Sequence, residues 1–144
     1  MTKRLILAGF SGAIVQFLLG WLIYGILLAD FMNSHTTHYE GLMKDMNGGS
    51  FIILIFLSGL VMSFLITYIF QHWAKFDKFL PGLTGGMLVG FLMALSFDLF
   101  SYASMNMITV ASMVVDVAAN TVVTGIVGGT IACVLGFRSS KATS

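Results

Sequence analysis

The sequence has few charged residues: Asp, Glu, Lys and Arg make up 9% of its 144 residues, whereas hydrophobic residues make up 58%. Soluble domains carry about 25% charged residues, so this composition predicts an integral membrane protein. The formal net charge is only +1, and nucleic-acid binding would require Lys and Arg clustered on a polar face. We therefore expect the lipid bilayer as a partner and no nucleic acid.

Cysteine and proline are also scarce, with Cys133 and Pro81 as the single examples. One cysteine cannot form an internal disulfide and gives no Cys-based zinc site. The G-x-S-x-G motif of hydrolases and the phosphate-binding G-x-x-x-x-G-K-[ST] motif are absent as well. An enzyme is therefore the least favoured of the function classes that we consider.

The sequence contains instead four long apolar runs. A helix needs about 20 apolar residues to cross a hydrocarbon core of about 30 Å, and a helix satisfies its own backbone groups where lipid cannot. The expected spans are residues 5–28, 50–71, 82–104 and 107–136. The last two connections are short, which forces neighbouring spans to run antiparallel. Residues 1–144 are thus predicted to form a single all-α domain, a four-helix transmembrane bundle.

The basic residues predict how this bundle is oriented. Six of them fall on one side of the expected membrane, namely Lys3, Arg4, Lys75, Lys78, Arg138 and Lys141, whereas Lys44 falls on the other. Positive charge is enriched in cytoplasmic segments. Both termini are therefore expected in the cytoplasm, and the loop of residues 29–49 is expected outside.

Two acidic residues lie inside the apolar runs, Asp98 in the third and Asp116 in the fourth. A charged carboxylate at the centre of a membrane helix costs roughly 2.5 to 3.5 kcal/mol on insertion scales. If the chain turns near Asn106, the helical rise places the two residues about 12 Å and about 15 Å below the turn, at similar levels on adjacent helices. No Lys or Arg lies within an expected span, so one of the two carboxyl groups should hold a proton unless a cation is bound.

Small and polar residues recur at four-residue steps in every span, which places them near one helix face. Small residues at this spacing usually serve helix packing, but packing does not explain the polar members. We expect a polar cluster in the outer half of the bundle that contains Gln16, Trp21, Tyr24, Asp98, Ser101, Tyr102, Asp116 and Asn120. Three interpretations stay open: a pair that carries a proton, a site for a cation or small ligand, and a neutral hydrogen-bonded network with Asn120 and Tyr102.

The outer loop contains two histidines and a glutamate, His35, His38 and Glu40. Imidazoles three residues apart on a helical turn, with a carboxylate two residues further on, can hold zinc or a similar divalent metal. The H-x-x-x-H spacing of zinc proteases is absent. A divalent metal at this loop is a secondary hypothesis beside ordinary solvated histidines.

Two segments carry a resemblance to known proteins: residues 17–28, F-L-L-G-W-L-I-Y-G-I-L-L, and the end of the chain from Asp98-Leu-Phe-Ser-Tyr through Val127-Gly-Gly-Thr-Ile. The first resembles the G-x-x-W-Y-G-x-L pattern that opens a bacterial family of small four-span membrane proteins known only as a domain of unknown function. The second is similar to the closing helical hairpin of that family. The resemblance implies a multi-pass protein of the bacterial inner membrane and implies no activity.

Three hypotheses for function follow. The first is a binding or transport-related protein in which Asp98 and Asp116 bind a proton, a cation or a small ligand. Four helices are few for a transport path, so this hypothesis includes a homo-oligomer. The second is a structural or accessory subunit whose aspartates meet a cation on a membrane partner. The third is an enzyme that uses the outer histidines and the aspartates.

Overall fold

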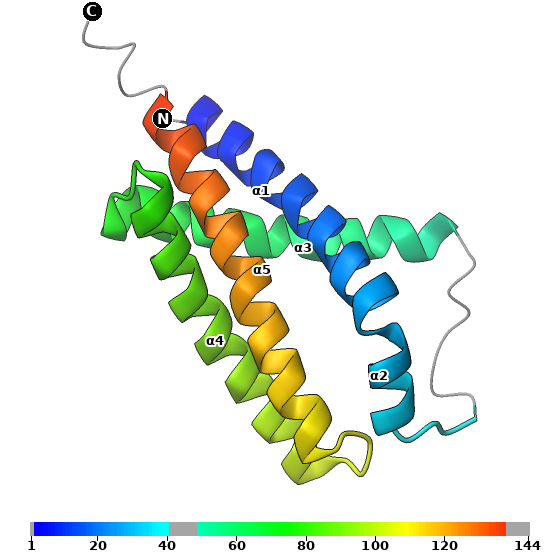
Figure 1. The fold of residues 1–144 in the computed structure, drawn as a ribbon. Helices are drawn as coiled ribbons and strands as arrows, with labels where there is room; N and C mark the ends of the chain where they lie inside the picture. Colours follow the sequence, from blue (N-terminus) through cyan, green and yellow to red (C-terminus); the bar gives the residue numbers. More distant parts are fainter. Residues whose placement is uncertain (1, 41–48, 138–144) are drawn as a thin grey trace, which may run out of the picture.

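A computed structural model of the chain describes residues 2–40 and 49–137. The described residues form an all-α fold (Figure 1). In chain order the elements are α1 (Thr2–Leu22), the π-helical turn η1 (Ile23–Leu27), α2 (Ala29–His35), α3 (Gly49–Ile69), the π-helical turn η2 (Phe70–Ala74), α4 (Phe79–Ser104) and α5 (Val110–Phe137).

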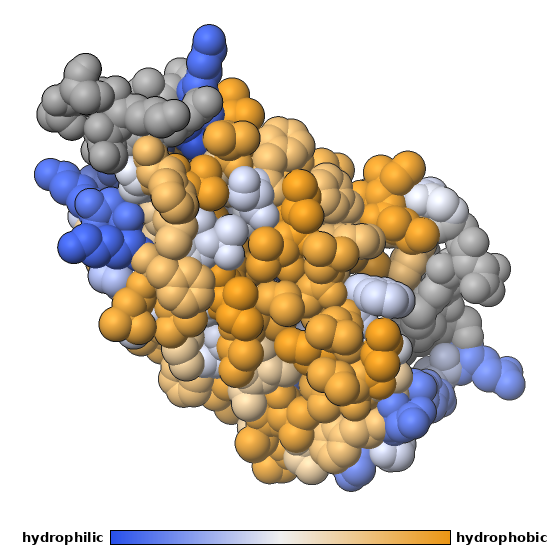
Figure 2. Space-filling model, turned by 45° about the horizontal axis from the view of Figure 1, so that its top comes forward, coloured by the Kyte–Doolittle hydropathy of each residue, from blue (hydrophilic) through white to orange (hydrophobic). Residues whose placement is uncertain are grey.

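Four helical segments are long and apolar enough to cross a membrane: Lys3–Leu27, Gly49–Ala74, Phe79–Ser104 and Val110–Phe137. They match the four predicted spans to within a few residues at each end. The prediction of an all-α protein with four candidate spans is therefore confirmed. Figure 2 agrees with it, since the visible surface is mostly apolar and hydrophilic residues gather toward opposite ends.

The loop that follows the first span begins with a short helix. Residues 29–35 form the short helix α2, and the chain beyond it pairs with the connection between α4 and α5. The backbone N–H of Thr37 donates to the carbonyl oxygen of Met107 at 2.9 Å, beside an isolated bridge between Thr36 and Ile108. The first part of the loop therefore lies against the outer end of the bundle.

Helices α4 and α5 make the most extensive contact in the fold and lie side by side in Figure 1. Glycines permit this close approach. A Cβ atom on Gly82 would collide with Ala132, and one on Gly86 would collide with the carbonyl oxygen of Thr124. The sequence left open whether the Gly82–Gly86–Gly90 face serves the bundle or a partner, and in the structure it packs against α5.

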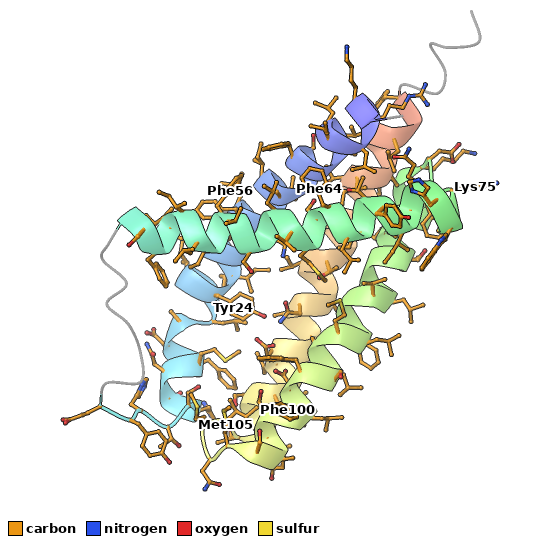
Figure 3. All side chains as sticks on the ribbon, turned by 180° about the vertical axis from the view of Figure 1, so that it is seen from behind. Tyr24, Phe56, Phe64, Lys75, Phe100 and Met105 are labelled. Atoms are coloured by element: carbon orange, nitrogen blue, oxygen red, sulfur yellow. The ribbon has the colours of Figure 1, made fainter. Side chains whose placement is uncertain are left out.

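Helix α3 lies across α1 and α5 instead of parallel to them (Figures 1 and 3). Its second half joins the core through Ser63, Ile66 and Thr67, which are fully buried. The Ser63 hydroxyl donates to the carbonyl oxygen of Gly9 on α1 at 2.7 Å. Its first half diverges from the bundle, and the side chains of Ile52 to Ile55 are exposed.

The start of α1, the end of α5 and the connection before α4 lie at the same end of the bundle (Figure 1). Four of the basic residues belong to this end, namely Lys3, Arg4, Lys75 and Lys78. Arg138, Lys141 and Lys44, which also entered the orientation prediction, lie outside the described residues.

The α4–α5 contact gives a first testable prediction. Replacing Gly86 with Ala should lower the free energy of unfolding by about 1–3 kcal/mol, the usual range for an overpacked core, because the new methyl group meets backbone atoms that cannot move aside. Thermal unfolding in detergent, followed by circular dichroism, would measure the loss. The control is Gly20→Ala, since a Cβ at Gly20 meets nothing within 4 Å among the described residues. Equal stability of the two variants would contradict the proposed role of Gly86.

Candidate functional site

A hydrogen-bonded network joins the first span to α5. The side-chain amide of Asn120 donates from Nδ2 to the Tyr24 hydroxyl oxygen at 2.7 Å and to Asp116 Oδ2 at 2.8 Å. Figure 3 shows Tyr24 pointing from η1 toward α5. Both N–H groups of the Asn120 amide are thus used, one on each neighbour.

The π-helical turn is the local feature that positions Tyr24. The backbone N–H of Leu28 donates to the carbonyl oxygen of Ile23 at 2.7 Å, five residues earlier. A turn of this kind holds one residue more than an α-helical turn, so it changes the face on which the following side chains lie, and such turns recur at functional sites. In this chain the π-helical turn contains the tyrosine that reaches across to Asn120.

Asp98 completes the network from α4. Only 7% of this residue is exposed, and its carboxyl group lies close enough to the carboxyl group of Asp116 for the two to interact. Two ionised carboxylates have no donor between them, so a hydrogen bond within the pair would require a proton on one of them. The sequence analysis predicted two acidic residues at the same level on adjacent helices, and in the structure they are in contact.

The two helices that carry the pair supply no countercharge. The sequence has no Lys or Arg between residues 79 and 137, the range that contains both α4 and α5. Asp98 Oδ2 is buried and has no hydrogen-bond partner among the described residues. A buried acceptor of this kind normally finds a partner. The pair therefore has capacity to bind one more proton or a cation.

Two predicted members of the polar cluster lie apart from this network. Tyr102 is 48% exposed, and Ser101 donates its hydroxyl to the carbonyl oxygen of Phe97 in its own helix. The expected network of Asn120 with Tyr102 is therefore wrong, and Tyr24 occupies that position. The physical reason is that most of the last turn of α4 is exposed, so a side chain there finds few neighbours to bond.

The remaining two predicted residues, Gln16 and Trp21, line a cavity of about 530 Å³ between α1, η1, α5 and the first half of α3. The polar residues in its lining are Gln16, Tyr24, Ser58 and Asn120, and the aromatic residues besides Tyr24 are Phe17, Trp21 and Phe51. The sequence did not reveal this cavity, because it results from the oblique path of α3. Asn120 belongs to both the network and the cavity.

The outer histidines do not share a helical turn. Helix α2 ends at His35, and Thr36 is already extended, so the expected geometry for His35 and His38 is wrong. His35 stacks on Phe31 with ring centroids 4.2 Å apart, and His38 Nε2 contacts the carbonyl oxygen of Asn33 at 3.1 Å. Within residues 2–40 and 49–137, which include Glu40, no three His, Cys, Asp or Glu side chains lie close enough together to hold a metal ion.

Comparison with models of known protein families, with curated proteins and with solved structures found no match for this chain. The resemblance of residues 17–28 and of the closing hairpin to a bacterial four-span family stays a prediction.

The network gives a second testable prediction. Replacing Asn120 with Ala should lower the free energy of unfolding by roughly 1 to 2 kcal/mol, because Asp116 Oδ2 loses its donor and Tyr24 loses its link to α5. Unfolding of the purified protein in mixed detergent micelles would measure this change. Thr121→Val is the matched control, since the Thr121 hydroxyl bonds only the carbonyl oxygen of Val117 in its own helix. A result in which both variants unfold alike would mean that Asn120 does not join the spans.

Proposed function

We propose that this protein binds a proton or a small cation at the Asp98–Asp116 pair within the membrane, in a transport-related role. The single observation that carries the proposal is the direct contact between the two carboxyl groups, of which Asp98 is almost fully buried. Ionisable residues inside membrane spans are rare and usually mark an ion or proton pathway.

A proton is the first choice among the occupants. A hydrogen bond between the two carboxyl groups would need one, and the Asn120 amide already donates to Asp116 Oδ2. A cation that replaced the proton would lie between the two carboxylates, with Asp98 Oδ2 as an available ligand. Exchange between these two occupants is the chemistry that we propose for the site.

The alternative is an accessory subunit whose aspartates meet a cation on a partner protein. The burial of Asp98 beside Asp116 favours the first proposal, because a partner could reach Asp98 only after the surrounding contacts opened. A detergent pull-down tests this alternative directly. It predicts a partner that is recovered with the wild-type chain and lost with Asp98→Asn.

We also propose a location in the bacterial inner membrane with both termini in the cytoplasm. What supports this orientation is the shared end of Lys3, Arg4, Lys75 and Lys78, since positive residues are enriched on the cytoplasmic side. Four helices are few for a transport path, so the proposal includes a homo-oligomer as the working form.

The pH dependence of stability tests the proton site. In the wild type, the shared proton is present at low pH and leaves as the pH rises, after which the buried Asp98 and the partly buried Asp116 carboxylates repel each other. The unfolding temperature should therefore fall from mildly acidic to mildly alkaline pH. Asp98→Asn keeps an amide that can donate to Asp116, so this variant should stay folded and lose most of that fall.

Asp30→Asn is the control for this experiment, because it removes an exposed carboxylate of α2 outside the network. It should follow the wild type. Addition of sodium, potassium or calcium ions at alkaline pH extends the test to cations, since a bound ion should restore stability to the wild type and not to Asp98→Asn. A wild-type unfolding temperature that depends neither on pH nor on these ions would refute the proposed function.

A further inference from the structure

The function proposed for the acidic pair does not involve the cavity that lies beside the network. In Figure 3, α3 crosses α1 and its first half then diverges from η1 and α2. The cavity lies in that wedge and measures about 530 Å³. Pockets that bind small molecules typically measure about 300–1,000 Å³, so this one has the size of a ligand site.

The walls of the cavity are suited to a molecule dissolved in the bilayer. Trp21 is 63% exposed on the first span, and Ile52 and Ile55 are exposed on α3. These side chains line the cavity and belong to helices that would face hydrocarbon. None of the described lining residues is charged. An ionic ligand would lack a countercharge in this cavity, whereas a ligand with an apolar body would fit its walls.

Gln16 gives the cavity a polar anchor. Its side chain belongs to the lining, and its Oε1 atom is buried without a hydrogen-bond partner among the described residues. Gln16 lies about 20 Å along the helix from Lys3, near the middle of the membrane, where water is scarce. A half turn of the amide exchanges its oxygen and nitrogen, so either atom can face the cavity.

Tyr24 adds a second polar group, about 12 Å further along the first span. Its hydroxyl accepts from Asn120 at 2.7 Å, but its own donor contact, to the carbonyl oxygen of Asp116, measures 3.5 Å. A hydrogen bond of that length is weak. The cavity lining thus contains an amide with an unpartnered oxygen and, further along the first span, the Tyr24 hydroxyl.

We propose that this cavity binds a neutral, lipid-dissolved alcohol. The apolar body of the alcohol would lie against the aromatic side chains of the lining, and its one hydroxyl would bond the Gln16 amide. The hydroxyl donates to the unpartnered amide oxygen once a half turn of the amide has brought this oxygen to the cavity side, and an ether cannot make this bond. The acyl chain of an ordinary phospholipid would fill the volume and leave Gln16 without a partner. This inference is independent of the function proposed for Asp98 and Asp116.

The two tryptophans of the chain provide a fluorescence test. Trp21 lines the cavity, whereas Trp73 lies in η2 at the other end of α3. The full-length Trp73→Phe protein would be placed in phosphatidylcholine nanodiscs and titrated with dibrominated stearyl alcohol, whose bromines quench tryptophan. We expect saturable quenching of Trp21 that oleyl alcohol reverses and oleyl methyl ether, which has no hydroxyl donor, reverses much less.

Variants of the lining sharpen this test. Gly20→Leu should abolish the saturable component, because a side chain at Gly20 enters open space in the cavity without displacing a described neighbour. Ile55→Phe should weaken it from the opposite wall. Ile53→Phe is the matched control, since Ile53 is 68% exposed and is not among the described lining residues. Gln16→Leu should weaken binding roughly threefold to tenfold, the effect of one hydrogen bond.

Several outcomes would overturn the inference. Quenching that rises in proportion to the brominated alcohol, equally in wild type and Gly20→Leu, would mean that Trp21 senses only bulk lipid. Equal competition by the alcohol and its methyl ether would mean that the Gln16 amide does not distinguish a hydroxyl from an ether. Failure here is separable from failure of the acidic site, because Asp98→Asn should keep saturable quenching and Gly20→Leu should keep the pH dependence of unfolding.

Discussion

The structure depends on the close approach of α4 and α5. Glycines at the contact let the two backbones touch, and this separation brings the carboxyl groups of Asp98 and Asp116 close together. Lipid offers no partner to a buried carboxyl group, so the pair depends on its protein neighbours; Asn120 donates to Asp116, whereas Asp98 Oδ2 has no partner among the described residues. The packing of α4 against α5 therefore decides whether the acidic pair can form. A wider separation of the two helices would leave two isolated carboxyl groups in an apolar medium.

The first span and α3 determine what surrounds that pair. The π-helical turn η1 brings Tyr24 to Asn120, while the oblique course of α3 leaves a cavity on the other side of the same asparagine. Asn120 thus contacts the acidic pair and also lines a space open toward lipid. Asn120 is therefore the residue that the two proposed sites share.

Simple rules applied to the sequence predicted much of the fold, and the predictions that were wrong have identifiable physical causes. Span limits followed from apolar length, and the similar depth of Asp98 and Asp116 followed from the helical rise. Tyr102 was assigned to the network from its depth in the outer half of the bundle, but most of the last turn of α4 is exposed. The histidines were assigned to one helical turn, but α2 ends at His35. In both cases ideal helical geometry was applied beyond the point where neighbours or the helix itself ended.

The sequence by itself determined the class of protein, the four spans and the presence of two acids at one level, because composition, apolar length and helical rise are local properties of the chain. Only the tertiary structure decided which tyrosine bonds Asn120, that the glycines of α4 pack against α5, and that α3 leaves a cavity beside Gln16. These features depend on how side chains from distant segments fit together. The sequence periodicity of a helix does not determine the angle at which it crosses another helix.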